Sequence, residues 1–283
     1  MRIQSAAKIN LVLNVLGRRA DGYHELQMIM QSVSLYDYLD FAPAETLEVN
    51  APVAITADIR QNLVYRAAAG FLAKYAPGKG VRITLTKNIP LAAGLAGGSA
   101  DCAGTLIGLN QFLQTGLPVR ELETIANSLG SDIAYCLYGG THLAGGRGEV
   151  LTKLPEIPKM YGLILKPPFA LSTADVYKQF SGQEARYSVQ TYLDGQINLH
   201  NLRENSGNGL YPAALKLRPD LADYSHILNR TRPVIAQMSG SGPAFFAFYA
   251  DIAARDAAFA LLKTGYEIYA AETTPFSQIV SGN

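Results

Sequence analysis

The chain of 283 residues can form one large domain or two of medium size, and its hydrophobic content of 48% and charged content of 17% are typical of a folded globular protein. A formal net charge of +1 argues against a nucleic-acid-binding protein that relies on a broad basic face. No segment approaches the roughly 20 apolar residues of a transmembrane helix, and two cysteines are too few for a disulfide framework. These features predict a cytoplasmic protein with no nucleic-acid or membrane partner.

The first predicted strand, residues 3–16, carries polar side chains on one face. Lys8, Asn10 and Asn14 alternate with apolar residues. Lys8 and Asn10 therefore project on the same side, about 7 Å apart. A solvated strand edge is the favoured interpretation of these two residues alone, because lysine is mostly exposed in proteins. The alternative is that they line a cleft.

The connection after this strand, residues 17–26, contains the sequence Asp21-Gly22-Tyr23-His24. Asp-Gly is a turn signal. Tyr23 and His24 could be packing residues of a loop, or they could offer an aromatic plane and a hydrogen-bonding ring to a planar ligand. Strands are predicted next at residues 27–41 and 47–55. A helix is predicted from Asn62, its expected N-cap, to residue 75.

The most informative segment is the glycine-rich stretch of residues 87–101. It lies between a predicted strand at 81–86 and a predicted helix at 99–114, for which Ser99 is the expected N-cap and Asp101 a first-turn acid. A strand, a glycine loop and a helix N-terminus together can bind an anion such as phosphate. The stretch matches neither standard phosphate-binding motif, so a flexible connector is an equally good interpretation of these residues alone.

The remaining predicted elements suggest a second unit. A helix is predicted at 119–129, and Asp132 has the position of an N-cap or first-turn acid in the apolar segment that follows. Glycine turns predict a hairpin around residues 139–149. Beyond a boundary at 155–158, the predicted order is strand, helix, strand, strand, helix, strand, which is typical of a ferredoxin-like fold. The polar stretch 198–209 is predicted to be a loop.

Three motifs, in this order, make the chain resemble the GHMP superfamily of small-molecule kinases. They are Ala7-Lys-Ile-Asn-Leu11 with Gly17-Arg-Arg-Ala-Asp-Gly-Tyr-His24, Pro90-Leu-Ala-Ala-Gly-Leu-Ala-Gly-Gly-Ser-Ala-Asp101, and Met238-Ser-Gly-Ser-Gly-Pro243. The Asp-Gly-Tyr-His segment narrows the resemblance to members with a cytidyl substrate. The resemblance implies an α+β, two-domain GHMP kinase fold. Its domains would be an N-terminal domain similar to domain 2 of ribosomal protein S5 (residues 1–157) and a C-terminal ferredoxin-like domain (residues 158–283).

The resemblance also implies roles for individual residues. Lys8 and Asp132 match the catalytic pair, in which Asp132 would accept the proton of the acceptor hydroxyl and Lys8 would keep that carboxylate charged. Cytosine would stack between Tyr23 and Tyr177 and hydrogen-bond to His24. The residues that match the ATP site are Asn62, Lys87, Pro90, Leu91, Ala92, Ala93, Gly94, Leu95, Ala96, Gly97, Gly98, Ser99 and Ala100. Those that match the substrate site are Asn10, Tyr23, His24, Tyr177, Gly240 and Ser241.

The implied reaction is phosphoryl transfer from ATP, with Mg²⁺, to the 2-hydroxyl of a cytidyl diphosphate of methylerythritol, by a monomer or homodimer. The sequence marks no metal ligand. One alternative is a mevalonate- or homoserine-type kinase of the same superfamily. The presence of Tyr23, His24 and Tyr177 together argues against it. Another is a non-enzymatic RNA-binding module, which the near-zero net charge and the presence of both Lys8 and Asp132 disfavour.

Overall fold

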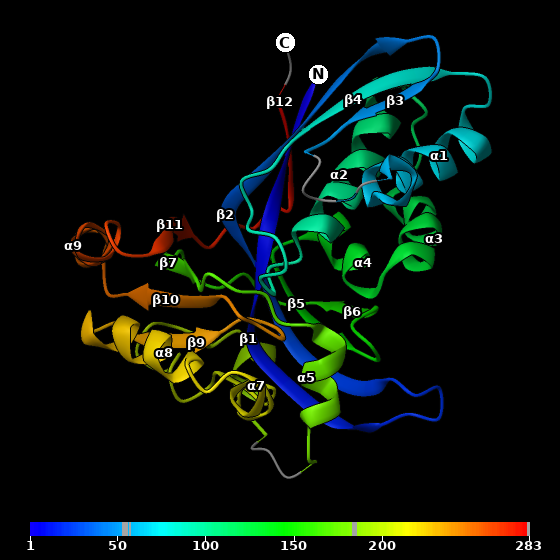
Figure 1. Ribbon diagram of the computed structural model, residues 1–283. Coiled ribbons are helices and arrows are strands. Elements are labelled where there is room, and N and C mark those ends of the chain that lie inside the picture. The colour runs from blue at the N-terminus through cyan, green and yellow to red at the C-terminus, as the bar shows by residue number, and fades with distance from the viewer. Residues whose placement is uncertain (53–55, 57, 183–185, 282–283) are drawn as a thin grey trace.

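The structure is a computed structural model that describes residues 1–52, 56, 58–182 and 186–281. In this part of the chain the strands form a sheet of eight and a sheet of four, with helices packed on both (Figure 1). The larger sheet has the main order β12-β1-β2-β4-β3, with β5 beside β2, β6 beside β5 and β8 beside β1. Its strands are β1 (Arg2–Arg18), β2 (His24–Ala44), β3 (Leu47–Asn50), β4 (Gly80–Thr86), β5 (Thr141–Gly145), β6 (Val150–Lys153), β8 (Gly207–Asn208) and β12 (Gln278–Ser281).

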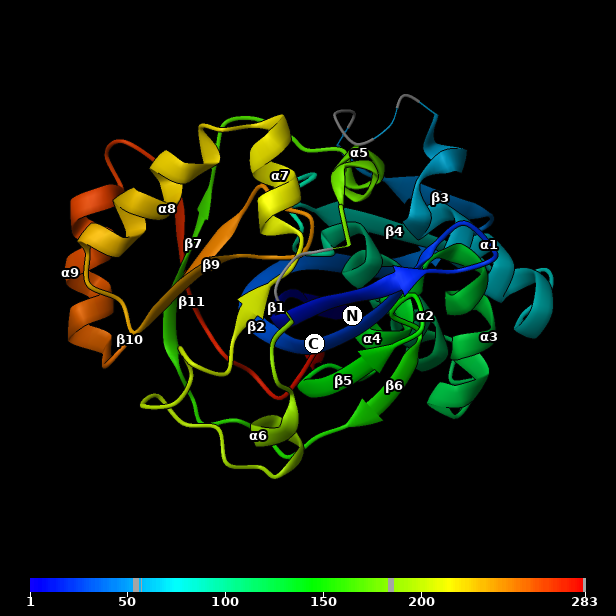
Figure 2. The same cartoon turned by 90° about the horizontal axis from the view of Figure 1, so that it is seen from below.

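The long antiparallel strands β1 and β2 lie at the centre of the molecule (Figure 2). The prediction that Lys8 and Asn10 form a solvated edge is wrong, because the two residues are 4% and 0% exposed. The loop 239–242 lies against both side chains, since a Cβ on Gly240 would be 3.4 Å from Lys8 Nζ and 3.5 Å from Asn10 Oδ1. Gln237, in strand β9 (Ile235–Met238) of the smaller sheet, donates hydrogen bonds from Nε2 to the carbonyls of Asn10 and Leu11, both at 2.9 Å.

Three α-helices pack on the larger sheet and a fourth, α3 (Val119–Leu129), packs on those helices. The three are α1 (Leu63–Tyr75), α2 (Gly97–Phe112) and α4 (Ser131–Tyr138), and a short 3₁₀ helix, Ile59–Gln61, precedes α1. Asn62 caps α1 as predicted, since its Oδ1 accepts the amide of Val64 at 2.8 Å. The prediction that Ser99 caps α2 is wrong. That helix begins two residues earlier, after Ala96, whose φ of 55° turns the chain into the first helical residues.

The smaller sheet has the order β11-β7-β10-β9, with every neighbouring pair antiparallel. This is the strand arrangement of the predicted ferredoxin-like fold. Figure 2 shows α8 and α9 on the side of the molecule away from α1–α4. The strands are β7 (Tyr161–Lys166), β9 (Ile235–Met238), β10 (Phe245–Tyr249) and β11 (Glu267–Glu272), and the helices are α5 (Thr173–Gln179), α6 (Gln190–Leu193), α7 (Tyr211–Leu217), α8 (Leu221–Arg230) and α9 (Ile252–Leu262).

Two short strands from the second half of the chain return to β1. The parallel strand β8 forms inside the predicted loop 198–209, and β12 pairs antiparallel with the start of β1. Residues from the second half of the chain therefore complete the larger sheet. The predicted domain boundary at residue 157 stays a prediction. The strand predicted at 47–55 ends at Asn50, and residues 53–55 lie outside the described part of the chain. No helix of the described residues is long and apolar enough to cross a bilayer.

Candidate active site

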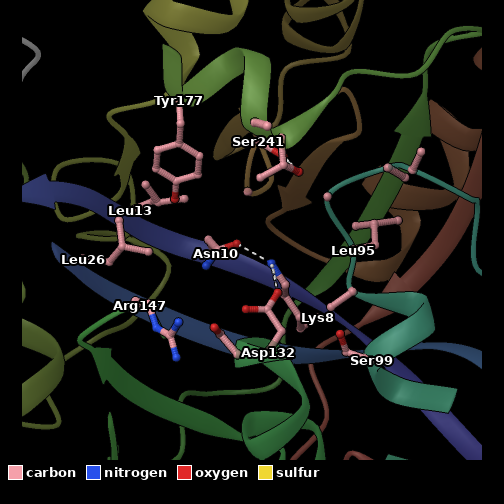
Figure 3. A pocket seen from close by; sticks show the side chains of 18 of the residues that line it. Lys8, Asn10, Leu13, Leu26, Leu95, Ser99, Asp132, Arg147, Tyr177 and Ser241 are labelled. Atoms are coloured by element: carbon pink, nitrogen blue, oxygen red, sulfur yellow. Dashed lines mark hydrogen bonds and ion pairs between the residues drawn. The ribbon is translucent and has the colours of Figure 1, made fainter. Parts of the chain in front are cut away.

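A cleft of about 1080 Å³ runs between the larger sheet with its helices and the segments attached to the smaller sheet. Its walls come from β1, β2, the loop 87–96, the first turns of α2 and α4, helix α5 and the loop 239–242. Figure 3 shows side chains from these segments pointing into one space. The cleft therefore collects residues that are more than 200 positions apart in the sequence, such as Lys8 and Ser241.

The floor of the cleft holds a lysine, an amide and a carboxylate in contact (Figure 3). Lys8 Nζ lies 3.6 Å from Asp132 Oδ2 and donates to Asn10 Oδ1 at 2.8 Å. The Lys8 side chain is 5% exposed, whereas that of Asp132 is 34% exposed. Asp132 thus faces the cleft with a cation behind it, an arrangement that can accept a proton from a bound hydroxyl group.

The glycine-rich loop forms the wall beside this pair. Residues 90–99 all line the cleft, and the free amides at the start of α2 lie at its edge. The loop is held on both sides. Leu95 O accepts the amide of Lys8 at 3.1 Å, and Gly94 O accepts Ser239 Oγ at 3.1 Å. Such a preorganised set of amides can bind the oxygens of a phosphate group.

Lys87, at the start of the loop, forms ion pairs with two buried carboxylates. Its Nζ donates to Asp37 Oδ2 and, at 2.7 Å, to Asp101 Oδ2. Burial opposes the charge of Lys87, but the carboxylates of Asp101 and Asp37 raise the lysine pKa above its ordinary value. Burial raises the pKa of Asp101 well above its usual range, and its Oδ1 has no hydrogen-bond partner among the described residues. Asp101 therefore belongs to a buried cluster, in contrast to its predicted place as a first-turn acid.

Aromatic side chains stand at the other end of the cleft. His24 and Tyr177 are stacked, with ring centroids 5.0 Å apart and an interplanar angle of 24°. Burial, helped by the charge of Arg18, lowers the pKa of His24, so the neutral ring is favoured. Tyr23 is 56% exposed, and the guanidinium carbon of Arg147 lies 4.8 Å from its ring centroid. In this structure Tyr177 faces His24 and Tyr23 faces Arg147.

Most of the predicted site residues share this cleft. Gly240 and Ser241 line it, and Ser241 Oγ is 2.8 Å from Thr173 Oγ1. Two residues of the predicted ATP site are not part of its wall: Asn62 caps α1, and Ala100 is fully buried in α2. Other residues of the wall were not among the predicted site residues, and these include the charged residues Arg18, Arg147 and Lys178 and the hydroxyl residue Thr173. For Arg147 a signal existed, because a lone charge interrupts the glycines of the turn 145–148.

Comparisons with known proteins agree on one family. The family described as "GHMP kinases N terminal domain" matches residues 62–140. A 4-diphosphocytidyl-2-C-methyl-D-erythritol kinase from Pelotomaculum thermopropionicum is 40% identical over 94% of this chain and 96% of its own. The enzyme of the same name from Carboxydothermus hydrogenoformans is 37% identical over 99% and 96%.

Solved structures point the same way. The crystal structure of a 4-(cytidine 5'-diphospho)-2C-methyl-D-erythritol kinase superposes with a TM-score of 0.84 at 30% identity, covering 96% of this chain and 99% of that one. A homoserine kinase from Cytophaga hutchinsonii reaches a TM-score of 0.76 at 19% identity, with coverages of 99% and 96%. The second likeness is one of fold alone.

Proposed function

The chain belongs to the GHMP kinase family, and we propose that it transfers the γ-phosphoryl group of ATP to the 2-hydroxyl group of 4-diphosphocytidyl-2-C-methyl-D-erythritol, a step in isoprenoid biosynthesis. The observation that carries the proposal is the cleft itself. It combines a loop suited to phosphate, the Lys8–Asp132 pair and an aromatic end with His24 and Tyr177. A donor, a reacting centre and an acceptor site are thus lined up in one space.

Asp132 acts as the proton acceptor in this proposal. The acceptor oxygen attacks the γ-phosphorus, the bond to the bridging oxygen of ADP breaks, and the hydroxyl proton passes to the carboxylate. Lys8 positions that carboxylate, since its Nζ is 3.6 Å away and donates a hydrogen bond to Asn10 Oδ1. The loop amides and the start of α2 stabilise the negative charge on the phosphates.

The acceptor's base binds at the aromatic end. The rings of Tyr23, His24 and Tyr177 all line this part of the cleft and offer stacking faces to cytosine. A hydrogen bond from the base edge to His24 selects cytosine, because a wrong base leaves polar groups unpaired. Asn10, Gly240 and Ser241 lie toward the reacting end and contact the methylerythritol part in this proposal.

Magnesium enters with ATP. The described residues hold no group of three histidine, cysteine, aspartate or glutamate side chains that could bind a metal ion by themselves. Mg²⁺ commonly keeps water and substrate phosphates as most of its ligands, so a site with few protein ligands fits it. Ser99 and Asp132 line the cleft beside the loop and would supply the protein oxygens. The ion would neutralise phosphate charge.

An assay of ADP release with three candidate acceptors tests the function. With ATP and Mg²⁺, we expect turnover with 4-diphosphocytidyl-2-C-methyl-D-erythritol and none with mevalonate or homoserine. Asp132→Asn should lower kcat by about 100- to 10,000-fold with little change in the KM for ATP. Asp223→Asn, at an exposed acid in the first turn of α8, is the control and should behave as wild type. Turnover of mevalonate or homoserine in place of the cytidyl substrate would refute the proposal.

A further inference from the structure

We propose that Arg147 binds the diphosphate group of the acceptor substrate. The proposal rests on the proposed function, because it needs an acceptor with a base at one end and the reacting hydroxyl at the other. Arg147 sits in the turn of the β5–β6 hairpin and lines the cleft (Figure 3). In the sequence this turn predicts a hairpin, and its charged residue Arg147 has no assigned role.

The turn that carries Arg147 is fixed to β2. Gly146 O accepts the amide of Leu26 at 2.8 Å, and the amide of Gly146 donates to Glu25 Oε1 at 3.0 Å. Glu149 Oε2 accepts the amide of Arg147 at 2.6 Å. The backbone of residue 147 therefore has a defined place, and only the side chain needs to order when a ligand binds.

Arg147 lies between the two ends of the proposed acceptor site. On one side its guanidinium carbon is 4.8 Å from the ring centroid of Tyr23, at the base end. On the other side its neighbour Gly148 adjoins the reacting end, where a Cβ on that glycine would be 3.5 Å from Asp132 Oδ1. In the acceptor, the diphosphate likewise joins the cytidine to the methylerythritol. The order of groups along the substrate thus matches the order of residues along this wall.

The guanidinium group of Arg147 has N–H donors that remain available to a ligand. Within the described part of the chain its ion-pair partner is Glu149, whose Oε1 is 3.7 Å from Nε, beyond hydrogen-bond distance. Its side chain is 36% exposed. Arginine presents a planar set of five N–H groups that fits two phosphate oxygens at once. A diphosphate beside it would form charge-assisted hydrogen bonds without displacing any contact that the fold needs.

The other cations of the cleft are less suited to this role. Lys8 Nζ is held by Asn10 and Asp132, and Lys87 Nζ by Asp37 and Asp101. Arg18 pairs with His24 across β1 and β2, which places it at the base end. Lys178 bonds to Asp175 and has a side chain that is 73% exposed, at the outer rim. Among the described residues of the cleft, Arg147 is therefore the cation best placed between the base end and the reacting end.

Binding of CDP compared with cytidine tests the proposal. Titration calorimetry, with the nucleotide site filled by a non-hydrolysable ATP analogue, gives the ratio of the two affinities. We expect Arg147→Met to weaken CDP binding by about tenfold to a hundredfold and to leave cytidine binding unchanged. Arg147→Lys, which keeps the charge, should retain part of the preference for CDP. Arg120→Met, at an exposed position on α3, is the matched control and should bind both probes as wild type.

Kinetics give a second measurement of the same variants. Arg147→Met should raise the KM for the acceptor by the factor lost in CDP affinity and leave the KM for ATP unchanged. An unchanged CDP-to-cytidine ratio overturns the proposal, and so does an equal loss for both probes, which would mean that Arg147 acts through the base end. A rise in the KM for ATP alone also overturns it. Failure of the proposed function has a different signature: wild type would show no preference for cytidine over uridine or adenosine.

Discussion

Single buried side chains give this fold part of its pH dependence, and His142 on β5 is the clearest case. It is 5% exposed, packs edge-on against Tyr135 with ring centroids 5.7 Å apart, and its Nδ1 has no hydrogen-bond partner among the described residues. Burial lowers the pKa of His142 below its ordinary value of about 6.5. Between these two pKa values the unfolded chain binds a proton that the folded chain does not. Stability therefore falls as the pH drops below about 6.5.

His142→Phe should reduce this dependence on pH. The phenyl ring keeps the flat shape but cannot take up a proton in either state, so the loss of unfolding free energy from about pH 7 to about pH 5 should be smaller than in wild type. Urea unfolding at both pH values measures the difference. His226→Gln, at an exposed histidine of α8, is the control and should retain the full dependence. An equal loss of unfolding free energy between the two pH values in His142→Phe and wild type would contradict the prediction.

At the residue scale, strand periodicity was enough to place Lys8 and Asn10 on one face of β1. It could not predict their burial, because residues far along the chain lie against both side chains, such as Gly240, where a Cβ would be 3.4 Å from Lys8 Nζ and 3.5 Å from Asn10 Oδ1. Such a contact leaves no local pattern. The alternative interpretation, that the two residues line a cleft, was already open from the sequence and agrees with the structure.

At the scale of elements, the entrance to the glycine-rich loop depends on Asp37 in β2. Its Oδ1 accepts the amides of Asn88 and Ile89 at 2.6 and 2.8 Å, and its Oδ2 accepts Lys87 Nζ. Asp37 is fully buried. One carboxylate therefore sets the path of the chain between β4 and the loop and also pairs with the lysine beneath it.

Asp37→Asn should be strongly destabilising. The amide oxygen can still accept the two backbone N–H groups, but the amide nitrogen that then faces Lys87 Nζ is a donor. Lys87 keeps only Asp101 as its partner, and losing one buried hydrogen bond of a charged group costs about 1.5–3 kcal/mol. The free energy of unfolding from urea titration measures this loss. Asp40→Asn is the matched control on the same strand, because Asp40 pairs with Arg2 at the surface, where ion pairs contribute little. Similar losses in the two variants would show that Asp37 has no special role.

Local patterns predicted most elements, and the exceptions have physical causes. The bounds predicted for 119–129 agree with α3, since its apolar spacing and a following glycine are strong local signals. The start of α2 was misplaced because Ala96 adopts a left-handed conformation that is uncommon outside glycine. Asp101 was misassigned as a first-turn acid because the sequence does not show its contact with Lys87.

At the scale of the whole molecule, long-range contacts join the two sheets at the cleft. Strand β8 places Asn208, whose Nδ2 donates to the carbonyls of Met238 and Gly240, both at 2.8 Å. The loop 239–242 in turn contacts the glycine-rich loop at Gly94. Strands of two or four residues carry too little periodicity to be predicted, so the sequence could not show that the second half of the chain completes the larger sheet.

Gly94→Ala compared with Gly78→Ala tests this junction. Both glycines have positive φ, 77° and 79°, so alanine costs about 1–2 kcal/mol at either position. At Gly94, however, a Cβ would lie 2.2 Å from Ser239 O, whereas at Gly78 nothing lies within 4 Å. We expect Gly78→Ala to lower the free energy of unfolding only by the cost of the positive φ and to keep full activity. Gly94→Ala should lose about 1–3 kcal/mol more and raise the KM for ATP, because the two loops must separate. Equal unfolding losses and an unchanged KM would mean that the contact does not shape the nucleotide site.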